Sequence, residues 1–185
     1  FERATTAIKE AIQAGFRVCT NTTIYKNTSE MEIKDLFSFL RGLGVHGMLV
    51  SPGFSFEHND NEIFLCRKEV QEKFGFIYGI SKEYKILNSP LYLKFLKGER
   101  HLSCTPWGNP TRNYLGWKSP CYLITDNHYR TFSEYMNNTD WKKYQEGSDP
   151  RCKNCMMHCG FEPTVVLEGG KRLADIIEMA KWSFS

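Results

Sequence analysis

The sequence predicts an α/β fold for residues 1–100, followed by a small cysteine-rich α+β domain in residues 101–185. Three observations predict this. Helix-like and strand-like segments alternate in the first half, and the connections between them are short. From residue 101 onward, Gly, Pro, Asn and Trp become frequent and helical periodicity lapses. Alternating helices and strands with short links imply parallel strands joined by right-handed crossovers.

The first half contains the alternating elements in a clear order. Gly15 ends an opening amphipathic helix, and Ser29 with Glu32 forms a capping box at the start of the next one. Pro52 and Gly53 end a short apolar run that is typical of a buried strand. The expected elements are a helix over 1–15, strands over 16–25 and 45–53, and helices over 28–44 and 61–79.

The second half carries fewer regular elements. A short helix over 90–98 follows the segment 84–89, and a hairpin lies between Cys104 and Cys121. Further helices are expected over 130–138 and 171–182. We place a domain boundary near residue 100.

Composition is that of an ordinary globular protein, with 41% hydrophobic and 24% charged residues over 185 positions. The net charge of +3 is too balanced to predict nucleic-acid binding. No apolar run reaches the length that a membrane helix needs. The chain begins at Phe1 without the pattern of a signal peptide, so we interpret it as a fragment whose beginning lies upstream.

Five cysteines form the most informative pattern. Cys152, Cys155 and Cys159 have the spacing C-x2-C-x3-C, and Cys104 and Cys121 flank the upstream hairpin. A metal centre needs about four such ligands, and C-x2-C directs two sulfurs at one ion. Buried structural cysteines are the alternative. The polar sequence around the triplet favours metal, and spacing alone does not separate zinc from an iron–sulfur cluster.

The remaining histidine and cysteine candidates are weaker. His158 is either a zinc ligand in a Cys3His set or an exposed loop residue, and the second is favoured. Cys19 and Cys66 are expected to be core thiols. The odd number of seven cysteines does not suit a secreted disulfide framework. The glycosylation sequon at Asn21 lies in a strand that we expect to be buried, where a glycan has no room. Both observations favour a reducing cytosol over secretion.

Aromatic and apolar segments have two interpretations. Trp107, Tyr114, Trp117 and Tyr122 interleave with the cysteines, where they either shelter a metal or an apolar substrate or simply form core. Core is favoured. Arg112 and Arg130 are expected on the surface. The 90–98 segment is a weak candidate for membrane contact.

The carboxyl ends of the two parallel strands are the expected ligand-binding edge, near residues 21–25 and 51–56. Polar side chains at this edge of the sheet suit ligand binding. A plain strand-to-helix loop explains residues 51–60 equally well, and threonine is common in strands because of its β-propensity alone.

Residues 104–160 carry a resemblance to a known family. The stretches "CTPWGNPTRNYLGWKSPCYL", "DW" at Asp140-Trp141 and "CKNCMMHCGFEPT" resemble the C-terminal domain of the radical S-adenosylmethionine enzymes of hopanoid biosynthesis, the adenosyl-hopene transferases. "GFRVCTNTTIY" and "LGVHGMLVSPGFSFE" are similar to the last two barrel strands of that family. The resemblance covers nearly the whole chain and is most specific over 104–160.

The resemblance implies a fold and an activity. The fold is the C-terminal part of a partial (β/α)6 radical SAM barrel, resembling a TIM barrel, with an appended auxiliary domain. The activity is transfer of a 5′-deoxyadenosyl radical from S-adenosylmethionine to the alkene of a hopene, giving adenosylhopane. The implied partners are the polycyclic hopene, S-adenosylmethionine and an electron donor such as flavodoxin or ferredoxin. The implied location is cytoplasmic, with the inner face of the membrane left open.

The resemblance also implies site residues. S-adenosylmethionine would contact the strand ends through Asn21, Thr23, Ser51, Pro52 and Gly53. An auxiliary [4Fe–4S] cluster, or zinc as the alternative, would be held among Cys104, Cys121, Cys152, Cys155 and Cys159.

One feature of that family is missing from this chain. The catalytic cluster of radical SAM enzymes is held by CxxxCxxC, which this sequence lacks. The chain alone is therefore expected not to cleave S-adenosylmethionine. The alternative hypothesis is a metal-stapled module that recognises a partner and does no chemistry.

Overall fold

A pair of parallel strands organises the first half of the chain. The computed structural model describes residues 1–55, 62–145 and 148–184. In it, β1 (Cys19–Ile24) pairs in parallel with β2 (Gly47–Pro52), from Cys19 opposite Gly47 to Ile24 opposite Pro52. The prediction of adjacent parallel strands is confirmed. The described residues have mixed α/β architecture, and their parallel sheet contains these two strands.

The backbone of residues 84–88 continues this sheet beyond β2. Met48 forms an isolated parallel bridge with Ile86. Asn88 Oδ1 accepts from the Val50 N–H at 2.8 Å, and Asn88 Nδ2 donates to the Val50 carbonyl at 3.0 Å. A buried amide side chain thus completes the hydrogen bonding of β2 where the strand bridge ends.

The helices of the first half begin at capping boxes. In α2 (Glu30–Leu43), the Ser29 N–H donates to Glu32 Oε2 at 2.7 Å, and the Glu32 N–H donates to Ser29 Oγ at 3.2 Å. The predicted cap and helix are confirmed, and Ile33, Phe37 and Leu40 are buried as expected. α1 (Glu2–Gln13) ends just before Gly15, whose φ is +86°.

The third helix starts later than predicted. α3 (Arg67–Ile80) begins at a cap in which the Cys66 N–H donates to Glu69 Oε2 at 2.8 Å. Before it, the Leu65 N–H donates to the Gly53 carbonyl at 3.2 Å, so this segment runs back along the strand ends instead of coiling. Residues 56–61, which include part of the predicted 51–60 loop, lie outside the described residues.

α4 (Pro90–Leu96) is buried on all sides. Leu91, Tyr92, Leu93, Phe95 and Leu96 are each at most 4% exposed. Membrane contact through residues 90–98 was therefore a wrong expectation, because α3, α6 and α7 cover this helix. Within the described part of the chain, we find no helix with both the length and the apolar character needed to cross a bilayer.

The second half contains an antiparallel sheet of order β3-β4-β5 and several helices. The expected hairpin is present as β3 and β4, whereas α6 was not predicted. The elements are β3 (Thr111–Asn113), β4 (Gly116–Pro120), β5 (Thr125–Tyr129), α5 (Phe132–Asn138), α6 (His158–Glu168), α7 (Leu173–Ser183), and the 3-10 turns η1 (Pro106–Gly108), η2 (Trp141–Tyr144) and η3 (Pro150–Cys152).

The main core contains residues from both halves. Phe161 of α6 stacks on Phe95 of α4 with ring centroids 4.4 Å apart. Met156 and Val165 join the same cluster of buried side chains as Phe37 and Phe74. The segment that carries three cysteines is therefore anchored to the helices of the first half. The domain boundary near residue 100 stays a prediction.

We expect Asn88→Ala to lower the free energy of unfolding by about 2–4 kcal/mol, because it leaves two buried backbone groups of Val50 without partners. Urea denaturation measures this. Asn137→Ala is the matched control, since Asn137 is exposed and bonds only a neighbouring side chain of its own helix. A loss for Asn88→Ala no larger than that of the control would contradict this assignment.

Candidate metal centre

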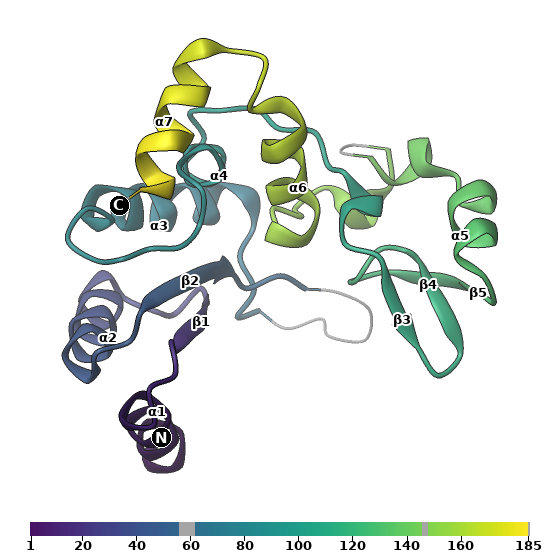
Figure 1. Cartoon of the computed structure of the whole chain (residues 1–185). Helices are drawn as coiled ribbons and strands as arrows, with labels where there is room; N and C mark the ends of the chain where they lie inside the picture. The colour runs from purple at the N-terminus through teal and green to yellow at the C-terminus, as the bar shows by residue number, and fades with distance from the viewer. Residues whose placement is uncertain (56–61, 146–147, 185) are drawn as a thin grey trace.

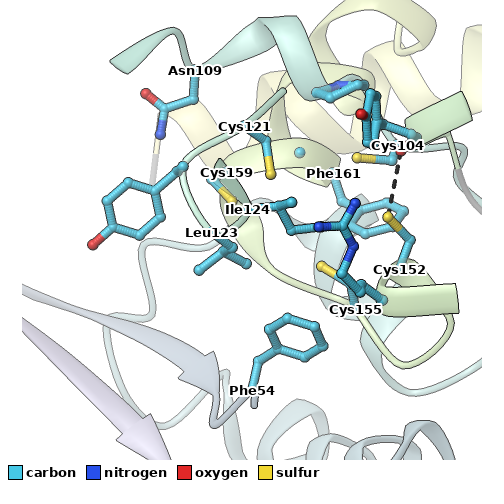
Figure 2. Close-up of a pocket in the computed structure, with 15 residues that line it drawn as sticks. Phe54, Cys104, Asn109, Cys121, Leu123, Ile124, Cys152, Cys155, Cys159 and Phe161 are labelled. Atoms are coloured by element: carbon cyan, nitrogen blue, oxygen red, sulfur yellow. Dashed lines mark hydrogen bonds between the residues drawn. The ribbon is translucent and has the colours of Figure 1, made fainter. Parts of the chain in front are cut away.

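Five cysteines from three separate segments line one cavity, although they span 55 positions of sequence numbering from residue 104 to residue 159. Figure 2 shows their side chains arranged around the same space. The cysteines are Cys104, Cys121, Cys152, Cys155 and Cys159. The rest of the wall is largely apolar and includes Phe54, Leu123, Ile124 and Phe161.

Cys104 is placed by close packing against α6. The Thr105 N–H donates to the Gly160 carbonyl at 2.9 Å, and the Thr105 and Thr164 hydroxyls are 2.7 Å apart. A Cβ atom added to Gly160 would collide with Cys104 Sγ. Glycine at position 160 is therefore what allows the Cys104 sulfur to approach the helix that carries Cys159.

Cys121 follows the last residue of β4 and is partly buried. Lys118 Nζ donates to the Tyr122 carbonyl at 2.7 Å, which holds the backbone just after this cysteine. Leu123 and Ile124 are each 4% exposed and form the apolar wall next to Cys121. The hairpin and the residues just after it thus contribute one thiol and part of the apolar wall around it.

The triplet segment is fixed by hydrogen bonds to distant elements. The Cys155 N–H donates to the Cys152 carbonyl at 3.0 Å, which closes the C-x2-C turn. Tyr92 Oη of α4 donates to the Met156 carbonyl at 2.7 Å, and Cys152 Sγ contacts the Tyr144 carbonyl at 3.7 Å. These bonds hold the turn in place without using the thiols of Cys155 and Cys159.

An arginine clamp joins the triplet segment to the antiparallel sheet. Arg151 donates two bonds to Asp126 of β5, at 2.8 and 2.9 Å, and also bonds Asp149 through Nε at 2.9 Å. Tyr144 Oη donates to Asp126 at 2.5 Å. The Arg151 bond lowers the pKa of the Asp126 carboxyl to about 2. The clamp thereby holds the Cys152 segment against the β5 end of the cavity.

Burial makes the cavity thiols poor acids. It raises the pKa of Cys152 to about 11 and that of Cys159 to about 12. Burial also raises the pKa of Cys155 well above its ordinary value, and Cys159, Cys104 and Cys121 add to the shift. At neutral pH these thiols are protonated and are therefore weak nucleophiles. A bound cation would supply the positive charge that several buried thiolates require.

The free space in the cavity is about 30 Å3. That is room for a water molecule or a single ion, whereas a four-iron cluster requires the surrounding side chains to separate. Over residues 1–55, 62–145 and 148–184, no three His, Cys, Asp or Glu side chains lie close enough to hold a metal ion. Metal ligation by these five cysteines stays a prediction.

A polar cleft of about 820 Å3 opens beside the cysteine cavity, at the carboxyl ends of β1 and β2. Phe54 and Arg151 line both spaces. Other residues of the cleft include Lys26, Asn27, Ser55, Glu69 and Asn154. Because ligands gather at the carboxyl ends of parallel strands, this cleft is the best candidate for a polar ligand.

The predicted S-adenosylmethionine residues lie on or next to these strands. Asn21 and Thr23 are exposed on β1, and Thr23 lies opposite Ser51. Ser51, Pro52 and Gly53 are buried. The close approach of Gly53 to the Tyr25 ring has a packing reason, since an added Cβ would lie 2.7 Å from Tyr25 Cδ1. Contact of these five residues with a ligand stays a prediction.

Several expectations about single residues were wrong. Cys19 and Cys66 are exposed and are not core thiols, because Cys19 lies on the outer face of β1 and Cys66 precedes the first turn of α3. Asn21 is exposed and not buried, since β1 has an open face, so its sequon gives no argument about compartment. His158 is half-buried and is not an exposed loop residue, because its Nδ1 lies 3.1 Å from Ser51 Oγ.

The aromatic residues divide into two groups. Trp107 contacts Trp141, and Trp117 contacts Phe132, so these tryptophans belong to ring clusters as expected. Tyr114 is 93% exposed and Tyr122 is 52% exposed, which contradicts a core role for both tyrosines. Tyr122 nevertheless lines the cysteine cavity. Arg112 and Arg130 lie on the surface, as predicted.

Asp126 and Arg151 were not singled out in the sequence, whereas Phe54 falls within the strand end 51–56 that was expected to face a ligand. Arg151 directly precedes Cys152 and follows Asp149 by two positions, and this local pattern is a usable signal for a clamp. Asp126 lies 25 positions away from Arg151 and has no such local signal.

Comparisons with known proteins add one finding. A family model described as "Domain of unknown function (DUF3463)" matches residues 48–179. The matched range runs from β2 to α7 and includes all five cysteines of the cavity. Neither a curated protein nor a solved structure matches the chain.

In metal-free protein, we expect the exposed thiols of Cys19 and Cys66 to react quickly with an aromatic disulfide reagent. The five cavity thiols should react slowly, because they are less exposed. Arg151→Met should raise the number of fast thiols, because it frees the Cys152 segment from Asp126. Arg130→Met, at an exposed arginine, is the control. Equal reaction profiles for the two variants would contradict the role of the clamp.

The clamp also predicts a pH dependence. The pKa of Asp126 is lowered from 3.8 to about 2, so the unfolded state binds more protons between these values. The Asp126 carboxylate therefore contributes fully to the free energy of unfolding above about pH 4, and this contribution is lost as the pH falls toward 2. The urea midpoint of Asp126→Asn should lie below that of the wild type at pH 7 and equal it near pH 2. A constant difference over this range would show that the carboxylate charge does not matter.

Proposed function

This chain belongs to the DUF3463 family, and from that premise we propose that it forms part of a radical S-adenosylmethionine adenosyl-hopene transferase. The proposed reaction adds a 5′-deoxyadenosyl radical to a hopene alkene and gives adenosylhopane. The chain contributes the last strands of a partial (β/α)6 barrel and an auxiliary metal centre. The protein is cytoplasmic, and its partners are S-adenosylmethionine, the hopene and a flavodoxin-like or ferredoxin-like electron donor.

One observation carries this proposal: the cysteine cavity abuts the carboxyl end of a parallel strand. Phe54, just after β2, lines the cavity, and His158 beside Cys159 lies within hydrogen-bond distance of Ser51. In barrel enzymes the reaction takes place at this edge of the sheet. A metal centre in the cavity would therefore lie close to bound substrate, and the adjoining polar cleft suits a charged, polar cofactor such as S-adenosylmethionine.

Within this proposal, four of the five cavity cysteines hold the metal as thiolates. A bound [4Fe–4S] cluster would supply an electron-transfer group or an open iron position near the substrate. The protein's own part is to exclude water with Phe54, Leu123 and Ile124, and to keep the ligand segments together through Arg151.

A second candidate function has a specific observation in its favour. The free space of about 30 Å3 has room for one ion, as in a structural zinc site, once the cysteine side chains turn toward it. In that case the chain is a metal-stapled module that binds a partner without chemistry. The two candidates differ in the metal that they require.

Metal analysis of anaerobically purified protein tests the proposal. We expect about four iron and four sulfide per chain, and we expect Cys155→Ser to lose most of both because Cys155 is a ligand. Cys19→Ser is the matched control, since that thiol is exposed and lies at the amino end of β1, away from the strand ends that face the cavity. One zinc per chain supports the structural module, and neither metal at any level rejects both candidates.

Activity is measured on protein that also carries a CxxxCxxC segment. Incubation with S-adenosylmethionine, reductant and a hopene should yield adenosylhopane, and Cys155→Ser should lower the yield more than Cys19→Ser does. Iron-loaded protein that forms 5′-deoxyadenosine but no adenosylhopane would reject the hopene as substrate while leaving the metal centre in place.

A further inference from the structure

Helix α7 is attached to the molecule through a mixed face of ion pairs and apolar contacts, in which Met179 packs against the main core. Arg100 donates two bonds to Asp175, at 2.9 and 2.7 Å, and Lys94 of α4 bonds Glu178 at 2.7 Å. The Asp175 side chain is only 9% exposed. Asp175 and Glu178 are three positions apart and therefore lie on the same side of the helix.

The opposite face of α7 is apolar and faces solvent. It contains Leu173, Ile176 and Ile177, which are 73%, 46% and 47% exposed, and Phe184 just after the helix, which is 92% exposed. Their spacing of three, four and seven places them along one stripe. Val166 and Leu167, at the end of α6, are also exposed, at 79% and 62%.

A surface helix normally turns its apolar stripe to the core, whereas α7 carries an additional apolar stripe on its solvent side. Four large apolar side chains along one stripe of an exposed helix face require an explanation, whereas scattered ones do not. Figure 1 shows the connection from α6 to α7 at the top of the view, at the opposite end of the molecule from α1. The side chains of the stripe are exposed and are therefore accessible to a partner.

Basic residues surround this stripe. Lys171 and Arg172 lie exposed in the α6–α7 connection, and Lys181 is exposed on α7. Glu168 offsets part of the charge through a 3.9 Å pair with Lys171. Because Arg100 and Lys94 neutralise Asp175 and Glu178, the charge that remains beside the apolar stripe is positive.

We propose that the end of α6, the connection and the outer face of α7 form a docking surface for a membrane that contains anionic phospholipids. Exposed apolar side chains flanked by lysine and arginine are the pattern by which a helix lies in the plane of the lipid interface. A second copy of the chain suits this surface less well, because a two-fold contact would bring Lys171, Arg172 and Lys181 against their own equivalents.

The inference goes beyond the proposed function and does not depend on it, since it rests on α7 and its surroundings alone. Vesicle binding is measured without iron, S-adenosylmethionine or hopene. A protein without any metal centre can pass this test, and a protein with an active metal centre can fail it.

Flotation with vesicles tests the proposal. The whole chain should float with vesicles of phosphatidylglycerol and phosphatidylcholine, and much less with phosphatidylcholine alone. The double variant Ile176→Asp, Ile177→Asp should lose at least tenfold in vesicle affinity, since it places charge in the apolar stripe. Tyr114→Asp is the control, because Tyr114 is 93% exposed on the distant hairpin. Circular dichroism confirms that each variant is folded.

Charge is tested separately with Arg172→Gln and Lys181→Gln, each of which should lower affinity for anionic vesicles by about fivefold. The proposal is overturned if the wild-type chain does not float with anionic vesicles, or if the double aspartate variant floats as well as Tyr114→Asp. It is also overturned if light scattering shows a wild-type dimer that the aspartate variant dissociates, because the stripe is then a contact between copies.

Discussion

The packing of α6 on α4 is the contact on which the rest of the structure depends. The ring of Phe161 stacks on Phe95, and Tyr92 holds the Met156 carbonyl from a fully buried position. In both contacts α4 holds a residue close in sequence to Cys155 or Cys159, namely Met156 or Phe161. Since α4 follows the backbone that extends the parallel sheet, this packing determines how far the cysteines lie from the strand ends.

The cysteine cavity combines two features that both disfavour negative charge in a metal-free protein. An apolar wall disfavours thiolates, and the proximity of several cysteines disfavours more than one negative charge. Structural cores rarely need five thiols in one place, whereas a metal centre needs several and offsets their charge. The arginine clamp has the complementary role, because Arg151, which lines the cavity, joins the Cys152 segment to β5 through Asp126 and is itself held by Asp149.

The sequence predicted those features that are encoded locally. The capping box at Ser29 and Glu32, the alternation that leads to β1 and β2, and the hairpin after Cys104 were all readable because neighbouring residues determine them. Helix α6 was missed because Gly160 and Pro163 suggest a loop, and because contacts with α4 and Cys104 stabilise the helix instead of its own periodicity. The exposure of Cys19 and the bond from Arg151 to Asp126 depend on tertiary neighbours, which a single sequence does not reveal.

The central claim is that the five cysteines surround a metal centre at the carboxyl edge of the parallel strands. The most direct measurement is anomalous X-ray scattering at the iron edge, from crystals of protein purified and reconstituted with iron and sulfide without oxygen. The account predicts an anomalous peak inside the cavity, bounded by the sulfurs of Cys104, Cys121, Cys152, Cys155 and Cys159, with the exposed Cys19 and Cys66 free of metal. A cavity without any metal peak, or iron bound only at the exposed cysteines, would contradict it.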